Sequence, residues 1–207
     1  VGTRTELGYN LFGYMIEQRT ISAAAELLRK STFTHDGSGR QLTQTAWLKD
    51  TGGTFQPYAT TTTAFNDNGQ VERVTDPLGH FSRTLYNEIG QQEFVFDKNA
   101  NQTQFIYNLR GLLERTVFPA VDGATPEEFS TYDVEGNRDT LRDRNGNLTT
   151  TAFDKLNRPF KVTHPDGGFS VTTYDPAGRV IAQTDERGFT TVSGFDAAGR
   201  RIFTIDP

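Results

Sequence analysis

A unit of about 21 residues recurs along the chain and constrains the fold more than any other feature. In each copy an aromatic residue, or histidine in one copy, is followed four positions later by glycine, or by asparagine in one copy. The successive ring positions lie 26, 30, 21, 21, 25, 21, 21 and 21 residues apart. The pairs are Tyr9 with Gly13, His35 with Gly39, Phe65 with Gly69, Tyr86 with Gly90, Tyr107 with Gly111, Tyr132 with Gly136, Phe153 with Asn157, Tyr174 with Gly178 and Phe195 with Gly199. One unit of this size cannot bury its own rings, so the pattern predicts stacked repeats that contact their neighbours.

A second marker lies eleven residues after the ring and has the composition of a turn. It is Asp76, Asp97, Asp143, Asp185 and Asp206 in five copies and His164 in another, with Gly79, Gly146, Gly167 and Gly188 three residues later and Ala100 as the exception. Aspartate can open a tight turn through its side chain, and glycine closes it because it tolerates positive φ. The pattern therefore predicts a β-hairpin for each unit. For the whole chain we predict an all-β fold of tandem antiparallel hairpins in one curved, continuous sheet.

The regularity differs along the chain. Residues 65–207 hold the regular repeats, the last of them truncated, whereas residues 1–64 hold irregular units, and we expect one continuous array without a domain boundary. The insertions TGGTFQPY (51–58) and PAVDGATPEE (119–128) are expected to be surface loops. Residues 22–30 combine good helix formers with a possible serine cap, so they predict either a short inserted helix or a strand poor in rings.

Composition excludes several classes of function. The net charge of −5 argues against a nucleic-acid binder, and the absence of cysteine excludes disulfides and thiolate zinc sites. The sequence contains neither an apolar run of about 18 residues nor a signal peptide. We therefore expect no membrane-spanning segment in these residues. The sequence begins at Val1 rather than Met, and an isolated curved sheet would leave open strand edges at both ends, so we expect the natural context to be longer on both sides.

The candidate catalytic and metal-binding residues, the three histidines and two acidic turns, are explained by their places in the repeat. His35 occupies a ring position and His164 a turn position, and His80 belongs to no catalytic motif, so we expect no enzyme activity. The turns that begin at Asp97 and Asp143 resemble the start of a calcium loop but lack its glycine and glutamate, and we expect no metal or cofactor.

Two further groups of residues allow a ligand-binding interpretation. Arg179, Arg200 and Arg201 follow glycine turns, and we expect ion pairs between neighbouring repeats there rather than a ligand site. Trp47, Phe55 and Tyr58 form the local aromatic cluster, which could hold carbohydrate but is more typical of packing.

The repeat resembles a known family. The stretch YDPAGR at residues 174–179, the turn from Asp185 to Gly188 and the pair Phe195-Asp196 resemble the YD repeat of the Rhs family. The same pair recurs as Phe65-Asn66, Tyr86-Asn87, Tyr107-Asn108, Tyr132-Asp133, Phe153-Asp154 and Tyr174-Asp175. That family includes bacterial Rhs toxins, the B and C components of Tc toxin complexes, and the teneurins, whose hairpins wind into a hollow shell. With nine anchors, and a last copy that stops after thirteen residues, this chain would be an arc of such a wall.

The resemblance implies a function without catalysis. It implies a structural shell segment that encapsulates a C-terminal toxin or effector domain before delivery, whose partners are the remaining repeats of the parent chain and that enclosed domain. It also implies a secreted or delivered bacterial effector, cytoplasmic before export, with a route such as type VI secretion. A glycan or the delivery machinery is a further expected partner, no cleavage residue is carried over, and the alternative is a cell-surface adhesion or carbohydrate- or protein-binding module.

Overall fold

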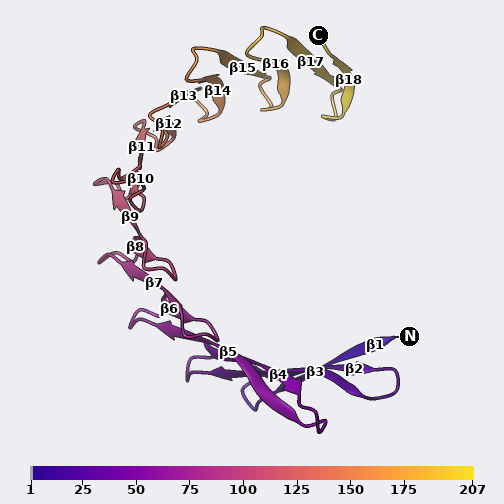
Figure 1. The fold of residues 1–207 in the computed structure, drawn as a ribbon. Coiled ribbons are helices and arrows are strands. Elements are labelled where there is room, and N and C mark those ends of the chain that lie inside the picture. The colour runs from indigo at the N-terminus through magenta and orange to yellow at the C-terminus, as the bar shows by residue number, and fades with distance from the viewer. Residues whose placement is uncertain (1) are drawn as a thin grey trace. The chain divides into compact units, whose positions relative to one another are not determined.

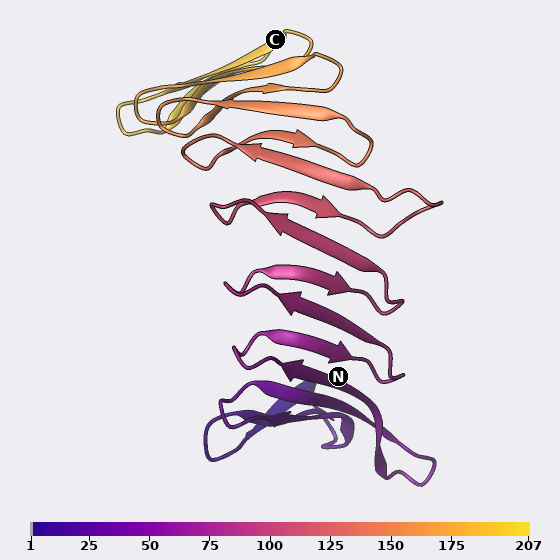
Figure 2. The same ribbon diagram turned by 90° about the vertical axis from the view of Figure 1, so that its left-hand side faces the viewer.

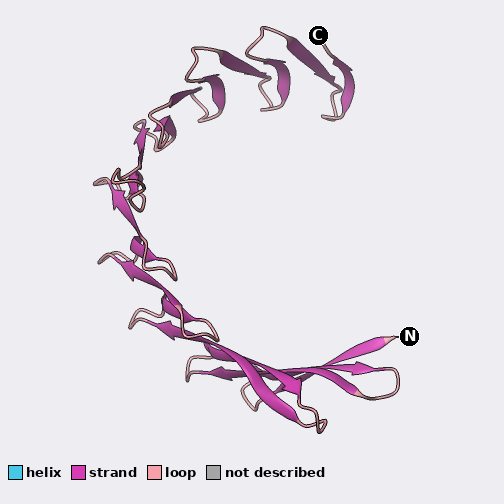
Figure 3. Cartoon of the chain, in the orientation of Figure 1, coloured by secondary structure: helices cyan, strands magenta, loops and turns pink. Residues whose placement is uncertain are grey.

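The computed structural model describes residues 2–207, and in that range the chain consists of strands joined by turns (Figures 1 and 3). Eighteen strands lie within the described residues, and none of these residues is helical. The chain divides into two compact units, residues 1–102 and 103–207.

The first unit is a single antiparallel sheet in which each strand pairs with the next one along the chain. Its strands are β1 (Thr3–Tyr9), β2 (Met15–Ser22), β3 (Leu27–His35), β4 (Gln41–Lys49), β5 (Phe55–Phe65), β6 (Val71–Thr75), β7 (Phe81–Tyr86) and β8 (Gln92–Phe96). This order is a meander, the topology that short tight turns between consecutive strands produce.

The second unit repeats the same arrangement with more uniform strands, which lie side by side in chain order in Figure 2. Its strands are β9 (Gln102–Tyr107), β10 (Leu113–Val117), β11 (Glu127–Tyr132), β12 (Arg138–Arg142), β13 (Leu148–Phe153), β14 (Pro159–Thr163), β15 (Phe169–Tyr174), β16 (Val180–Thr184), β17 (Thr190–Phe195) and β18 (Arg201–Ile205). Tandem antiparallel hairpins are thus confirmed as the fold class.

Residues 22–30 form no helix: residues 23–26 are a hairpin turn, and residues 27–30 belong to β3, as the strand alternative predicted. β2 ends at Ser22 and β3 begins at Leu27, while Ala25 adopts a positive φ of 62°. The Ser22 hydroxyl accepts a hydrogen bond from the Glu26 amide at 3.1 Å, and the Ala25 amide donates to the Ser22 carbonyl at 3.0 Å. Pairing between β2 and β3 satisfies the flanking backbone, so tertiary pairing overrides the local helix propensity here.

The insertion TGGTFQPY lengthens a hairpin instead of forming a surface loop, which corrects the expectation from sequence. Only the turn at its start lies outside strands, and Phe55 to Tyr58 belong to β5, the longest strand at 11 residues. Pro57 lies beside the register shift between Ala46 and Trp47, where a strand tolerates a residue without an amide hydrogen. Residues 119–126 of the second insertion form a loop that contains an isolated bridge between Val121 and Ala124, and its last two residues begin β11.

Each sheet is a single layer, and this limits burial. Among the described residues, Ile21 and Phe33 are the buried apolar side chains and Thr116 is the buried polar one. A second layer is what normally encloses a hydrophobic core. Stability must therefore come from contacts between adjacent strands and repeats, as in other repeat arrays.

Candidate functional site: the turns and the contacts between repeats

The turn after each ring residue has one geometry, seen most simply at residues 175–179. The Asp175 carboxylate accepts the Arg179 amide at 2.9 Å, and the Gly178 amide donates to the Asp175 carbonyl at 2.9 Å. Gly178 has a φ of 85°, and the strand register shifts between Thr173 and Tyr174. This is a tight turn closed by a left-handed residue and a bulge, in which the aspartate side chain satisfies backbone amides.

The predicted marker residues occupy equivalent places in both units. At the ring end of the hairpins, a positive φ occurs at Gly13, Gly39, Gly69, Gly90, Gly111, Gly136, Asn157, Gly178 and Gly199. At the opposite end it occurs at Gly79, Ala100, Gly146, Gly167 and Gly188. In each of these turns the amide of the left-handed residue donates to the carbonyl of the residue three positions earlier, at 2.9 to 3.2 Å.

Hydrogen bonds lower the carboxyl pKa of several turn aspartates. At Asp175 and Asp196 the backbone amides of Arg179 and Arg200 are the main cause of a lowered carboxyl pKa. At Asp154 the leading cause of the lowered pKa is the side-chain hydrogen bond from Arg158. Side-chain amide donors act in the same way on the pKa values of Asp97, Asp133 and Asp143. A hydrogen bond donated to a carboxylate favours its charged form, so each of these turns is tied to ionisation of its aspartate.

The arginine after the glycine joins its own turn to the next repeat. Arg179 Nε donates to Asp175 Oδ2 at 2.6 Å, while Arg179 Nη1 lies 3.4 Å from the backbone carbonyl oxygen of Asp196. Its guanidinium carbon lies 4.9 Å from the ring centroid of Phe195, within the range of a cation–π contact. Arg158 makes the same three contacts with Asp154, Asp175 and the Tyr174 ring.

The prediction that Arg179 and Arg200 form ion pairs with neighbouring repeats is wrong. Arg179 and Arg200 form their ion pairs within their own turns, with Asp175 and Asp196, because the side chains lie four residues apart across one tight turn. The contact that Arg179 makes with its neighbour is to a carbonyl and a ring. Arg201 is exposed.

The space above most of the ring-end turn glycines is filled from the preceding repeat. A Cβ at Gly69 would lie 2.8 Å from Arg40 Nη1, and one at Gly199 would lie 3.4 Å from Arg179 Nη1. The corresponding neighbours are Tyr14 at Gly39, Gln70 at Gly90, Arg110 at Gly136 and Arg158 at Gly178. Glycine therefore serves two purposes here, a positive φ and room for the neighbouring side chain. The sequence signal for these contacts is that most of the contacting residues directly follow a turn glycine or its equivalent.

The tyrosine rings add a hydrogen bond in the opposite direction. Tyr174 donates its hydroxyl to the Pro159 carbonyl at 2.8 Å, Tyr132 donates to Leu113 at 2.7 Å, and Tyr86 donates to Val71 at 2.8 Å. Each acceptor lies at the start of the strand after the preceding ring-end turn. At these three positions the tyrosine hydroxyl thus joins its repeat to the one before it.

The histidines have separate structural surroundings and form no constellation. His35 lies beside the Tyr14 ring, with 5.4 Å between the ring centroids, and its buried Nδ1 has no hydrogen-bond partner among the described residues. His164 Nε2 lies 3.1 Å from Glu186 Oε1, and His80 Nδ1 lies 3.6 Å from Asp76 Oδ2. Within residues 2–207, His, Asp and Glu side chains form no group that could hold a metal ion.

The two turns that resemble calcium loops use their carboxylates internally. Asp97 accepts hydrogen bonds from the amides of Asn99 and Asn101, at 2.8 and 2.9 Å, and from the Asn101 side chain at 2.8 Å. Asp143 repeats these contacts with Asn145 and Asn147. The side-chain oxygens that suggested a cation site therefore stabilise turns.

The aromatic cluster is partly covered by lysines. Lys30 Nζ lies 4.8 Å from the Trp47 ring centroid, and Lys49 Nζ lies 5.7 Å from that of Phe55. The Trp47 indole donates to the Thr32 hydroxyl at 2.9 Å, whereas Tyr58 is exposed. A lysine ammonium thus lies over one face of two of the three rings, in a cation–π contact.

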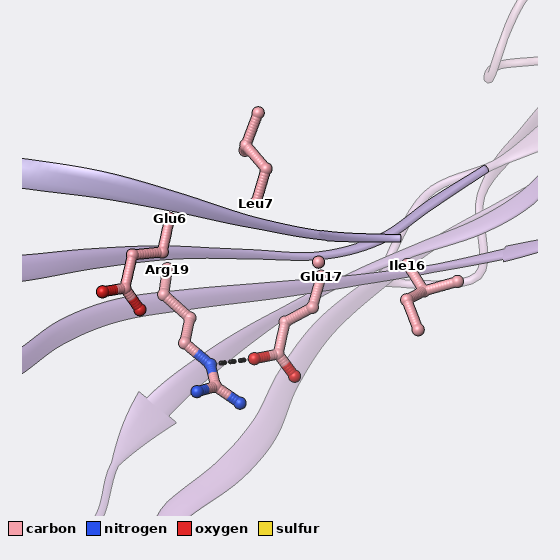
Figure 4. A pocket seen from close by; sticks show the side chains of 6 residues that line it. Glu6, Leu7, Ile16, Glu17 and Arg19 are labelled. Carbon is pink, nitrogen blue, oxygen red and sulfur yellow. Dashed lines mark hydrogen bonds and ion pairs between the residues drawn. The ribbon is translucent and has the colours of Figure 1, made fainter. Parts of the chain in front are cut away.

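A shallow pocket of about 290 Å³ lies between β1 and β2 (Figure 4). Its lining includes Glu6, Leu7, Ile16 and the ion pair between Glu17 and Arg19. Partial burial opposes ionisation of Glu17, but the Arg19 hydrogen bond and the Lys30 charge outweigh it and lower the carboxyl pKa. Glu17 and Arg19 are thus paired with each other, and Glu6 forms an ion pair with Arg4.

The described residues contain no helix that is both long and apolar enough to cross a membrane.

Comparisons with known proteins agree with the repeat seen in the sequence. Residues 174–207 match the RHS repeat family model. No curated protein matches the chain by sequence. Among solved structures, the chain is similar to TcdB2-TccC3-Cdc42, with 15% identity, 97% of this chain and 14% of that chain covered, and a TM-score of 0.46.

Two further similar structures are of the same kind. TcdB2-TccC3 has 16% identity, 98% and 14% coverage, and a TM-score of 0.44. The Photorhabdus luminescens Tc holotoxin pore has 13% identity, 98% and 15% coverage, and a TM-score of 0.31. The chain thus spans about one seventh of the length of these structures. The match to the RHS repeat family model covers one complete copy of the recurring unit and the truncated last copy.

Proposed function

We propose that the chain is a non-catalytic wall segment of an Rhs-repeat shell that encloses a C-terminal toxin or effector domain before delivery. The observation that carries this proposal is the single-layer sheet, in which repeats are joined by their neighbours and very few side chains are buried. A layer of this kind has two accessible faces, so it suits the separation of an interior from an exterior.

The polar contacts support a wall rather than a catalytic site. The turn carboxylates accept hydrogen bonds from backbone amides. Arg158 and Arg179 each contact both their own turn and the next repeat. Groups committed in this way stabilise the array and are not available to activate a substrate.

The proposal also covers the partners of this chain, its delivery and the extent of its repeat array. We infer that the remaining repeats of the parent chain and an enclosed C-terminal domain are the partners, and that the assembly is secreted or delivered to a target cell. We also propose that the chain forms one array, with irregular units at residues 1–64 and regular repeats at residues 65–207. These inferences rest on the Rhs repeat at residues 174–207.

Electron microscopy of the natural full-length protein tests the proposal. A hollow particle with density inside is expected, and removal of the C-terminal domain should empty that particle without changing its outline. An open array without a cavity would contradict enclosure and would favour the alternative, a module that presents its surface to a glycan or a partner protein.

A further inference from the structure

The connection between β10 and β11 is a long ordered loop in a place where other hairpins have a tight turn. Residues 118–126 join these two strands, whereas residues 143–147 suffice to join β12 to β13. The Phe118 amide donates to the Pro126 carbonyl at 2.9 Å, and a bridge joins Val121 to Ala124, so the loop has a defined shape. A long ordered loop on a regular scaffold is a common place for a binding site.

An open pocket of about 400 Å³ lies between this loop and the turn at residues 143–147. Residues 124–127 line it on the loop side, Arg142 and Arg144 line it on the turn side, and Phe129 of β11 also lines it. The volume is within the range of sites for small molecules. The lining combines an aromatic ring and a proline with two cations, so it offers both apolar surface and positive charge.

The two arginines of this pocket differ in what they contact. Arg144 Nε lies 3.2 Å from Glu128 Oε1, and its guanidinium carbon lies 3.5 Å from the Phe118 ring centroid. Arg142 pairs in register with Phe129, which places both side chains on one face of the sheet. Among the described residues the exposed Arg142 guanidinium has no ion pair or hydrogen bond. Its donors are therefore available to a ligand.

The carboxylates that line the pocket do not neutralise Arg142. Asp143 accepts one hydrogen bond from the Asn147 amide and one from the Asn147 side chain, both at 2.9 Å. Glu127 Oε2 lies 3.6 Å from Arg115 Nη1. Both carboxylates thus have other partners, whereas a free guanidinium can bind a carboxylate through two parallel hydrogen bonds.

A similar pocket in the first unit lacks this free charge. It has a volume of about 280 Å³ and is lined by Phe81 and Arg83 of β7 and by the turn after β8. Arg83 Nη2 donates to Glu72 Oε1 at 2.7 Å, and Lys98 Nζ donates to Asp76 Oδ2 at 2.8 Å. Its cations are paired, so an apolar pocket beside cations is not enough to leave a guanidinium open.

We propose that the pocket between residues 118–126 and residues 143–147 binds a small organic carboxylate that carries an apolar group. In this site the Arg142 guanidinium donates to both carboxylate oxygens, and the apolar group packs on Phe129 and Pro126. Phe129 is 38% exposed, so its ring presents apolar surface to the ligand. A neutral ligand would leave Arg142 without its partner, and an inorganic anion would leave the apolar surface uncovered.

Ligand-observed NMR on the natural full-length protein tests the site with phenylacetate as the probe. We expect saturation transfer to the phenyl protons, and phenylacetamide, which has the same apolar group without the charge, should bind at least about tenfold more weakly. Equal affinities of the two compounds would overturn the role of the carboxylate. Displacement of phenylacetate by an equal concentration of inorganic phosphate would overturn the role of the apolar group.

A matched pair of arginine variants assigns the binding to this pocket. Arg142→Gln should raise the dissociation constant of phenylacetate at least about tenfold, because it removes the charged donor. Arg138 lies in the same strand and is also exposed, but it does not line the pocket, so Arg138→Gln should change the dissociation constant less than about twofold. Equal effects of the two variants would overturn the proposal.

A lysine variant separates charge from geometry at this position. Arg142→Lys keeps the positive charge but loses the planar pair of donors, so its affinity for phenylacetate should lie between those of the unmodified protein and Arg142→Gln. Arg142→Gln removes no ion pair or hydrogen bond within the described residues, so its thermal unfolding should match that of the unmodified protein. An affinity of Arg142→Lys as low as that of Arg142→Gln, or an affinity unchanged in both, would overturn the paired hydrogen bonds to Arg142.

This inference does not depend on the proposed shell. It uses one loop and one turn of the second unit alone. Phenylacetate can fail to bind while electron microscopy shows a filled hollow particle, and it can bind at Arg142 in a protein that has no cavity.

Discussion

Arg179 Nη1 lies 3.4 Å from the backbone carbonyl oxygen of Asp196, while Nε of the same guanidinium holds the Asp175 carboxylate at 2.6 Å. One planar side chain thus closes its own turn and contacts the following one. A lysine could not make both contacts, because it presents one ammonium group instead of a rigid set of donors. The relationship explains how a sheet with few buried side chains is held together from repeat to repeat.

Replacing the shared arginine should weaken the array. Arg179→Gln removes the contact with Asp196 and the cation–π contact with Phe195, and it should lower the free energy of unfolding by about 1 kcal/mol. Arg187→Gln is the control, because the Arg187 side chain is 80% exposed and should change stability by less than about 0.5 kcal/mol. Urea unfolding measures both variants, and equal losses would contradict the inter-repeat role.

Gly69 lies in a ring-end turn and Gly79 in a turn at the opposite end of a hairpin, and replacement by alanine should destabilise the protein to different extents at these two positions. Gly69 and Gly79 have φ values of 79° and 86°, so Gly69→Ala and Gly79→Ala should each cost about 1 kcal/mol from backbone strain. Gly69→Ala should cost more, because its Cβ would lie 2.8 Å from Arg40 Nη1, whereas a Cβ at Gly79 meets nothing within 4 Å.

A double-mutant cycle isolates that extra cost. Gly69→Ala made in the Arg40→Ala background should lose the additional destabilisation and retain the strain alone. Thermal unfolding of the four proteins provides the coupling energy, and additive effects would refute a direct contact between Arg40 and the Gly69 position.

Gly194 lies under the Phe203 ring, so a side chain at this position should be poorly tolerated. A Cβ there would overlap the ring, and Gly194→Ala should destabilise the last hairpin by about 1 to 3 kcal/mol. Gly8→Ala is the matched control at the same place in the first hairpin, where the nearest atom, Glu17 Cβ, would lie at 3.5 Å. Hydrogen exchange of the β17 and β18 amides should accelerate in the first variant and stay unchanged in the second.

The stability of the array should fall in acid. The Asn147 side chain and backbone amides lower the Asp143 carboxyl pKa below its ordinary value of 3.8. The unfolded chain therefore binds protons first as pH decreases, so this stabilisation is complete above about pH 4 and is lost as pH falls through the lower pKa of the folded state.

An asparagine variant measures this dependence at one turn. Asp143→Asn keeps an acceptor oxygen of the type that Asn108 uses for the amides of Arg110 and Leu112, but it cannot titrate. Urea unfolding at pH 6 and pH 2.5 should show a smaller loss of stability in Asp143→Asn than in the unmodified chain. Asp67→Asn replaces an exposed turn carboxylate and serves as the control; the same reduction there would refute the assignment.

The ring hydroxyl should contribute separately from the ring. Tyr174→Phe removes the hydrogen bond to the Pro159 carbonyl and should cost about 1 kcal/mol, since that carbonyl loses its donor. Tyr58 is 71% exposed, and Tyr58→Phe should leave the unfolding free energy unchanged within about 0.5 kcal/mol. Chemical denaturation distinguishes the two, and no difference would show that the Tyr174 hydroxyl is solvated at no cost.

The sequence alone determined where the chain turns and what kind of structure lies between the turns. Asp175 with Gly178, and Asp185 with Gly188, predict tight turns because an aspartate side chain and a left-handed glycine act within five consecutive residues. This is local chemistry, and the same residues adopt the same geometry in both units. The all-β fold and the repeat follow from it.

Tertiary structure decided what the turns contact. Arg179 could have paired with a carboxylate of either repeat, and only the folded geometry assigns its ion pair to Asp175 and its neighbour contact to the Asp196 carbonyl. Residues 22–30 favour a helix locally, yet pairing of β2 with β3 makes them a hairpin. The single layer likewise leaves only Ile21 and Phe33 as buried apolar side chains among the described residues. These outcomes depend on which strand lies beside which, and hydrogen bonds between strands outweigh the preferences of a short segment.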